Sequence, residues 1–438
     1  MKKEKTIVIH SSTGRRSRRI RHRIGASFLA LLLLLVTMYG TRAAIHRYEP
    51  AVFGETDFSA DMTFDLSLYE RKLILPAERD TLRLMQLADP QLKFGFMTQD
   101  RETMASFAAA LDAENPDLVI CTGDLTCSVF TYDAYLYFAD FMEARGQYWT
   151  LTFGNHDAEY DCSKFTLTKL LSRYPHCLFS AGPANLTGTG NFLLNVYRGE
   201  EATVPSYSLI LLDSNMYGRA VTADGQERRV YGWFGTDQIA FYTWAVEGLQ
   251  TLNPDIASAA FFHIPVKEYA SMYYAEELAL GHAIPDAIDP SALLPVHDVT
   301  GQVAEFPRKP SQILDPGYDI GIAYQGENTG FYDTARTLGS TEAMFCGHCH
   351  LDDLKGFYGD IRLCFGLSSG YHTYPYFKTE NFFTRLFGLA DRPTWNMSLW
   401  IAPDGTPMDK GVTLIEISLD GEDYGITDVH DRLYSSYR

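Results

Sequence analysis

Side chains that bind metals and move protons follow five apolar runs in this sequence. They are Asp89 with Gln91, Asp124, the triplet Asn155, His156 and Asp157, the single His263, and the pair His348 and His350. Imidazole nitrogens together with carboxylate and amide oxygens suit Mn, Fe, Zn or Ni ions better than Ca or Mg. Each cluster alone is weak evidence, but the five together predict one shared metal centre.

The apolar runs themselves predict the strands that carry these clusters. The stretches TLRLMQLAD, DLVICTGD and QYWTLTFGNHD each have the composition of a buried strand that ends in polar residues. Between them, residues 104–111 show apolar side chains at helical spacing, and a second helical stretch covers residues 132–143. This β-α-β-α-β order predicts a buried parallel or mixed sheet. Because ligands bind beyond the carboxyl ends of such strands, we expect the clusters to converge.

The order of the motifs resembles that of the calcineurin-like metallophosphoesterases. That family carries D-x-H, GD, GNHD or GNHE, a single His and GHxH. This chain has DPQ, GD, GNHD, His263 and GHCH in the same order over residues 81–376. The stretches GWFGTDQIAFYTW and AFFHIPVKEY are similar to purple-acid-phosphatase-like proteins that lack the purple site. The resemblance implies an α/β fold with four layers, α/β/β/α, built on two mixed sheets.

The resemblance also implies which residues hold two metal ions. One ion would be bound by Asp89, Gln91, Asp124 and His350, and the other by Asp124, Asn155, His263 and His348. A carboxylate such as Asp124 can bridge two cations, and bound metal lowers the pKa of water toward ~7. The expected nucleophile is therefore a hydroxide that bridges two divalent or transition metal ions, which we expect to be Mn, Fe, Zn or Ni.

His156 is the expected general acid, because it lies beside the ligand Asn155 without needing to bind metal itself. We expect Asp157 to orient or charge its imidazole. Two positions depart from the family. Gln91 replaces the His of D-x-H, and its amide oxygen is a weaker donor to a transition metal than imidazole. Cys127 stands where purple acid phosphatases have a metal-binding Tyr, so the ferric-tyrosinate site is not expected.

The N-terminal segment predicts attachment to a membrane. Residues 1–23 hold nine Lys and Arg and one acid, and residues 24–40 form an uncharged apolar stretch. This pattern predicts a cytoplasmic tail and a transmembrane signal anchor, with the remainder outside the cytoplasm. The alternative is secretion after signal-peptide cleavage, although the small-x-small site at Thr41 and Ala43 is weak. We expect a linker at 41–76 and the catalytic domain at 77–438, with an insertion or lid at 266–321.

The net charge and the motifs together indicate the function. The net charge of the chain is -18, and the net charge of the part after residue 23 is -26. Because such an acidic domain repels polyanions, nucleic acid is not an expected partner. We predict a phosphoester hydrolase that acts on a phosphorylated small molecule or a lipid-linked substrate, with a phosphomonoester as the first choice. A phosphodiesterase or pyrophosphatase for nucleotides or lipid-linked phosphates is the alternative, and a non-catalytic membrane protein with this fold is the competing class. The tyrosines are assigned to the core, and Cys162 and Cys177 either pair or stay free.

Overall fold

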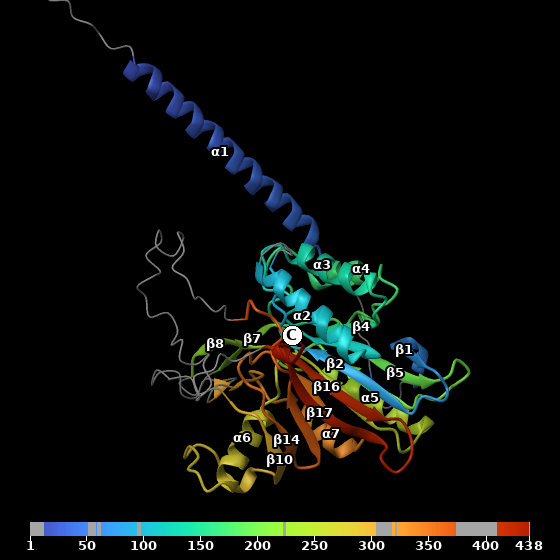
Figure 1. Ribbon diagram of the computed structural model, residues 1–438. Coiled ribbons are helices and arrows are strands. Elements are labelled where there is room, and N and C mark those ends of the chain that lie inside the picture. Colours follow the sequence, from blue (N-terminus) through green and yellow to red (C-terminus); the bar gives the residue numbers. More distant parts are fainter. Residues whose placement is uncertain are drawn as a thin grey trace, which may run out of the picture.

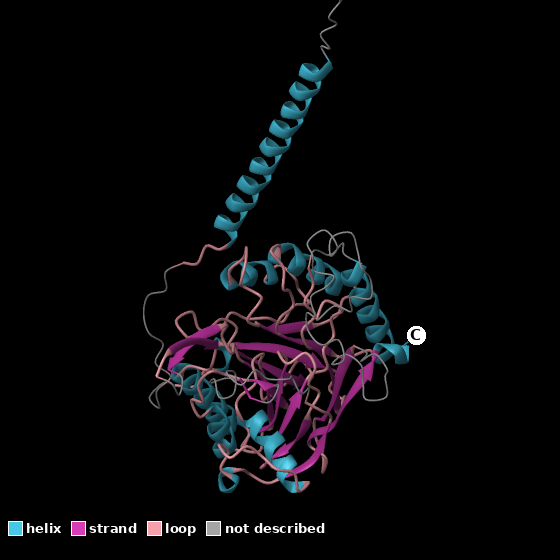
Figure 2. Cartoon of the chain, turned by 90° about the vertical axis from the view of Figure 1, so that its left-hand side faces the viewer, coloured by secondary structure: helices cyan, strands magenta, loops and turns pink. Residues whose placement is uncertain are grey.

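Two mixed β-sheets lie face to face between two layers of helices (Figures 1 and 2). The computed structural model describes residues 13–50, 58, 63–93, 98–221, 225–303, 318–319, 322–373 and 410–437. This arrangement confirms the predicted α/β class with two mixed sheets.

The smaller sheet has five strands in the order β17-β16-β2-β3-β4. Its strands are β2 (Thr81–Leu87), β3 (Leu118–Thr122), β4 (Trp149–Thr152), β16 (Gly411–Ser418) and β17 (Gly425–Leu433). Strands β2, β3 and β4 are parallel, whereas β16 and β17 complete the sheet in antiparallel pairs. The three parallel strands are the ones predicted from the first three polar clusters.

The larger sheet has eight strands in the order β1-β5-β6-β9-β13-β15-β14-β10. They are β1 (Glu70–Leu75), β5 (Phe192–Arg198), β6 (Tyr207–Leu211), β9 (Ser258–Phe261), β10 (Val296–Thr300), β13 (Thr341–Cys346), β14 (Lys355–Tyr358) and β15 (Ile361–Phe365). Its centre, β6-β9-β13-β15, is parallel. Two short pairs stand apart from both sheets: β7 (Tyr217–Val221) with β8 (Glu227–Tyr231), and β11 (Tyr318–Asp319) with β12 (Ile322–Ala323).

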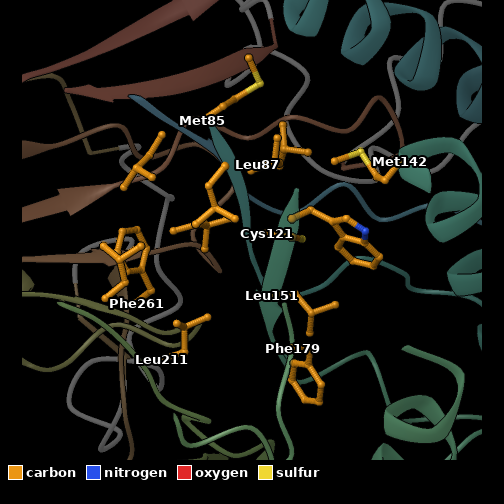
Figure 3. Packing of buried hydrophobic residues seen from close by; sticks show 14 of the residues in the cluster. Met85, Leu87, Cys121, Met142, Leu151, Phe179, Leu211 and Phe261 are labelled. Atoms are coloured by element: carbon orange, nitrogen blue, oxygen red, sulfur yellow. The ribbon is translucent and has the colours of Figure 1, made fainter. Parts of the chain in front are cut away.

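Two hydrophobic cores explain why the central strands are apolar without interruption. Along β6, Leu209 and Leu211 face the core between the sheets, while Ile210 faces the core on the other side. A strand buried on both faces has no solvent side, so its sequence does not alternate. Figure 3 shows the first core, in which Leu211 and Phe261 of the larger sheet approach the side chains of the smaller sheet.

The helices form the outer layers. The first core is closed by α2 (Thr98–Glu114), α3 (Thr131–Ala144) and α4 (Lys164–Leu171), and the second by α5 (Thr236–Leu252), α6 (Glu268–Ala279) and α7 (Phe331–Leu338). Short 3₁₀ turns occur at Leu66–Leu68, Pro290–Ala292 and Tyr434–Tyr437. The helices thus cover the outer faces of the two sheets and leave the carboxyl ends of the central strands to the loops that carry the polar clusters.

Helix α1 (Thr13–His46) projects from the helical layer formed by α2, α3 and α4 (Figure 1). Its segment Ser27–His46 has 20 residues and a mean hydropathy of 1.9, and none of this window is buried in the fold. By length and composition this helix is compatible with either a membrane anchor or a signal sequence.

Several elements fall inside regions that the sequence placed outside the regular fold. Strand β1 lies within the predicted linker 41–76 and pairs in parallel with β5. Helix α6 and edge strand β10 lie within the predicted insertion 266–321, while residues 304–317 and 320–321 of that range lie outside the described residues. The domain boundaries remain predictions, but the sheet begins earlier than the sequence indicated.

Candidate metal centre

All five polar clusters lie at the carboxyl ends of parallel strands, where the two sheets meet. Asp89 and Gln91 follow β2, Asp124 follows β3, Asn155 and His156 follow β4, His263 follows β9, and His348 and His350 follow β13. Asp89, Asp124, Asn155 and His263 are at most 1% exposed. Two groups of side chains have donor atoms close enough to hold a metal ion: Asp124, His263 and His348, and Asp89, Asp124 and His350.

The first group is built around the imidazole of His263. Its Nδ1 lies 2.9 Å from the backbone carbonyl of Thr122, which can only accept, so Nδ1 carries a proton. Its Nε2 then faces Asn155 Oδ1 at 3.1 Å, Asp124 Oδ1 at 3.4 Å and His348 Nδ1 at 3.2 Å. A lone pair at Nε2 would repel the two oxygens, so the geometry requires a positive charge between them. A proton or a metal ion fits this position.

The charge of Asp124 has a clear effect on its neighbours. Burial alone would lower the pKa of His263, but the Asp124 carboxylate and its hydrogen bond outweigh burial and raise that pKa to about 9. Burial would likewise raise the pKa of Asp124, but the charges of His263 and His156 hold it below its ordinary value. Asp124 is therefore ionised, and its negative charge is available to a cation.

The second group lies on the other side of the same carboxylate. Asp89 Oδ1 lies 3.2 Å from His350 Nε2, and the side-chain amide of Gln91 lies 3.1 Å from the same nitrogen. Gln91 also donates to Asp124 Oδ2 at 3.4 Å, whereas Asp124 Oδ1 faces the first group. Asp124 thus turns one oxygen toward each group, as a bridging carboxylate would. Both contacts are made by the amide nitrogen Nε2 of Gln91, so the amide would have to turn by about half a rotation to offer its neutral oxygen to a cation.

Backbone strain is concentrated at these side chains. Asp89, Gln91, Asp124 and His348 have φ values of 53°, 45°, 49° and 74°, in the left-handed region that side chains rarely adopt. A Cβ on Gly154 would come within 2.2 Å of Asp124 Oδ1. The GNHD motif therefore begins with Gly because the loop after β4 passes directly against the Asp124 carboxylate.

The contacts of His156 differ from the sequence prediction. His156 Nδ1 lies 2.5 Å from Glu159 Oε2, and its Nε2 lies 4.0 Å from Asp124 Oδ2. Asp157 instead accepts hydrogen bonds from the backbone of Thr126 at 3.2 Å and Gly154 at 2.8 Å. Burial and the nearby Asp124 charge raise the pKa of Asp157 to about 7. The carboxylate that contacts the imidazole is therefore Glu159, three residues along the turn, while Asp157 joins the loops after β3 and β4.

A hairpin that the sequence did not indicate borders the first group. Tyr217 Oη, on β7, accepts a hydrogen bond of 3.0 Å from Asn155 Nδ2. This bond turns Asn155 Oδ1 toward His263. The Tyr231 ring, on β8, meets the His348 ring edge-on with 4.4 Å between centroids. These two tyrosines therefore lie at the site rather than in the core, and nothing in the short, charged strands of the hairpin distinguishes them in the sequence.

The cysteines take no part in either group. All seven are free thiols, including Cys162 and Cys177. Cys349, between the two histidines of GHCH, exchanges hydrogen bonds with the backbone of Ala323 and so points away from the donor groups. Cys127, at the position of the tyrosine in purple acid phosphatases, is partly exposed, and Lys93 donates to its carbonyl.

Comparison with known proteins identifies the family of this chain and several similar proteins. The family model described as "Calcineurin-like phosphoesterase" matches residues 82–301, half of the chain. "Probable inactive purple acid phosphatase 28" of Arabidopsis thaliana is 24% identical over 329 residues, which cover 67% of this chain and 72% of the relative. "Phosphatase DCR2" of Saccharomyces cerevisiae is 29% identical over 184 residues, which cover 40% of this chain and 30% of the relative. A solved "dimetal phosphatase" from Danio rerio covers 81% of this chain and 100% of its own, with 9% identity and a TM-score of 0.40.

Proposed function

The chain belongs to the calcineurin-like phosphoesterase family. We propose that it is a two-metal phosphoester hydrolase and that its substrate is a phosphomonoester. The observation that supports this proposal is the orientation of Asp124, which turns one carboxylate oxygen toward each donor group. A single bridging anion between two sets of ligands is what a pair of cations needs. The seven proposed ligands are Asp89, Gln91, Asp124, Asn155, His263, His348 and His350.

The proposed reaction adds water to the phosphorus and releases inorganic phosphate and the alcohol. Two bound ions would polarise the phosphoryl oxygens and activate the attacking water. The chain itself would bind and orient the ester, and His156 would donate a proton from Nε2 to the leaving oxygen. Glu159 holds the other ring nitrogen, Nδ1, so the acidic proton is directed toward the donor groups. Asp157 would act through the loops that it joins rather than on the imidazole.

The experiment that tests this proposal is hydrolysis of p-nitrophenyl phosphate and bis-p-nitrophenyl phosphate by the full chain. We expect turnover of the monoester with added Mn and loss of turnover with chelator. Preferential turnover of the diester would replace the monoester proposal with the diester alternative. His156→Ala should lower kcat by ~10²–10⁴. His176→Ala is the matched control, because His176 contacts Glu143 at 2.9 Å on another part of the fold.

A second candidate function has one specific observation in its favour. The Arabidopsis relative is named as a probable inactive purple acid phosphatase. If this chain is likewise a non-catalytic member, metal-loaded protein will hydrolyse neither ester although it contains two ions per chain. The two candidates are thus separated by measuring the metal content and the hydrolysis rate on the same preparation.

We also propose that α1 is retained as a membrane anchor, with the catalytic domain outside the cytoplasm. The last turns of this helix contact the body: the Arg42 guanidinium lies 6.0 Å from the Phe130 ring and 3.8 Å from Asp161, and His46 stacks on Tyr132 at 4.4 Å. Cleavage after residue 43 would remove Arg42 and therefore its contacts with Phe130 and Asp161. Mass spectrometry of N-terminal peptides from the membrane fraction tests this proposal, and a mature chain that begins at residue 44 would contradict it.

A further inference from the structure

The hairpin β7–β8 is fixed to the candidate metal centre at its base. Tyr217 and Tyr231 are paired across the two strands. Tyr217 accepts a hydrogen bond from Asn155, and Tyr231 contacts the ring of His348. The hairpin lies beside the ends of both sheets, at the left of Figure 1. Residues farther along its two strands therefore extend outward from the site in a defined direction.

Arg229 is the next residue on the same face of the hairpin. Side chains alternate along a strand, so Arg229 and Tyr231 share one face and lie about 7 Å apart. The Arg229 guanidinium lies 3.5 Å from the centroid of the Tyr217 ring. The other neighbour of that ring is Tyr231, stacked at 6.0 Å. The ring thus holds an exposed cation at a fixed distance from the proposed ligands.

The charge of Arg229 has no carboxylate partner among the described residues, whereas Arg219, opposite it, pairs with Glu227 at 2.9 Å. An arginine without a carboxylate partner is unusual here, because the chain after residue 23 has a net charge of -26 and is rich in carboxylates. Arg229 lies over the Tyr217 ring and Tyr231 stacks beside it at 6.0 Å, so the ring has less surface left on which a nucleobase could stack. The chemistry of this part of the hairpin therefore favours an anion.

We propose that Arg229 binds a second phosphate group of the substrate, which makes the substrate class a bisphosphate ester. This inference rests on the proposed function, because one phosphate must occupy the metal centre. The second phosphate would then lie about one step of the strand, ~7 Å, farther out. A guanidinium matches the oxygens of a phosphate with two parallel hydrogen bonds, which a lysine cannot reproduce in the same geometry.

The test compares propane-1,3-diol bisphosphate with 3-hydroxypropyl phosphate, two substrates that differ only in the second phosphate. The measured quantity is the ratio of their kcat/KM values. We expect the wild-type protein to prefer the bisphosphate, and Arg229→Gln to lower the ratio about tenfold, mainly through KM. Arg229→Lys should restore part of the preference. Higher ionic strength should reduce the wild-type preference, because exposed charges are screened.

The matched control is Arg228→Gln, which removes the same charge from the neighbouring residue on the opposite face of β8. This variant should keep the wild-type ratio. The inference is overturned if Arg229→Gln leaves the ratio unchanged or if Arg228→Gln lowers it equally. Hydrolysis of neither substrate by metal-loaded wild-type protein would instead contradict the proposed function, so the two failures are distinguishable.

Discussion

The contact between His156 and Glu159 leads to the sharpest prediction about catalysis. Glu159→Ala removes the carboxylate that lies 2.5 Å from His156 Nδ1. A hydrogen bond to a charged group contributes ~1.5–3 kcal/mol. The side chains are 29% and 25% exposed, so water weakens the pair and the lower end of this range applies. Since each ~1.4 kcal/mol changes a rate tenfold, we expect kcat to fall about tenfold.

The assay is steady-state hydrolysis of p-nitrophenyl phosphate by four proteins: wild type, Glu159→Ala, His156→Ala and the double variant. If Glu159 acts through His156, its substitution will lower kcat in the wild-type background and have no further effect once the imidazole is absent. Glu159→Gln can still accept a hydrogen bond from Nδ1, so it should retain more activity than Glu159→Ala. KM should change little, because Glu159 holds the ring rather than the substrate.

Two results would refute this reasoning. Equal losses from Glu159→Ala in both backgrounds would mean that Glu159 acts independently of His156. A Glu159→Ala variant with wild-type kcat would mean that the imidazole is oriented by other contacts. Asp157→Asn serves as the comparison, because its carboxylate joins two loops through backbone amides. We expect that substitution to lower the free energy of unfolding as well as the rate.

Three further predictions concern metal binding and stability. Tyr217→Phe removes the hydroxyl that orients Asn155 and should weaken binding of the first-group metal about 10- to 100-fold, measured by competition with a chromogenic chelator. Lys164→Met leaves the buried Asp213 carboxylate without the ammonium now 2.6 Å away, and should lower the free energy of unfolding in urea by roughly 3 kcal/mol. Burial raises the pKa of Glu342 above its ordinary value of 4.5, although hydrogen bonds to its carboxylate act to lower it. The Glu342 carboxyl group therefore binds a proton more tightly in the native state than in the unfolded state. Stability should therefore fall as the pH rises above 4.5 through the raised pKa, and Glu342→Gln should flatten that part of the profile.

The proposed metal ligands could be located in the sequence because the strands that precede them are buried on both faces. Such strands appear in the sequence as uninterrupted apolar runs, and their carboxyl ends are marked by the first polar residues. Strand β1, in contrast, lies at the edge of the larger sheet and was assigned to a linker. Its sequence, ERKLIL, includes exposed charged residues and a short apolar end, so it lacks the signal of a central strand.

The role of Glu159 could not be read from the sequence, because adjacency along a turn does not give the direction of a side chain. Asp157 is the nearest acid to His156, yet it is fully buried and turned toward backbone amides. Glu159 is three residues away and reaches the imidazole because the chain folds back on itself. The hairpin tyrosines were missed for a related reason: their contacts join residues more than 60 positions apart in the chain.

The carboxylates at the candidate centre also hold the loops that carry their partners. Asp89 Oδ2 accepts the backbone N–H of His348 at 2.9 Å, and Asp124 Oδ1 accepts that of His156 at 2.9 Å. These bonds offset the cost of left-handed backbone at Asp89, Asp124 and His348, which is on the order of 1 kcal/mol or more for each residue. The loops are thus arranged by the same carboxylates that would bind the cations. Metal binding should therefore require little rearrangement of the backbone, and most of its free energy would go into affinity rather than into ordering the site.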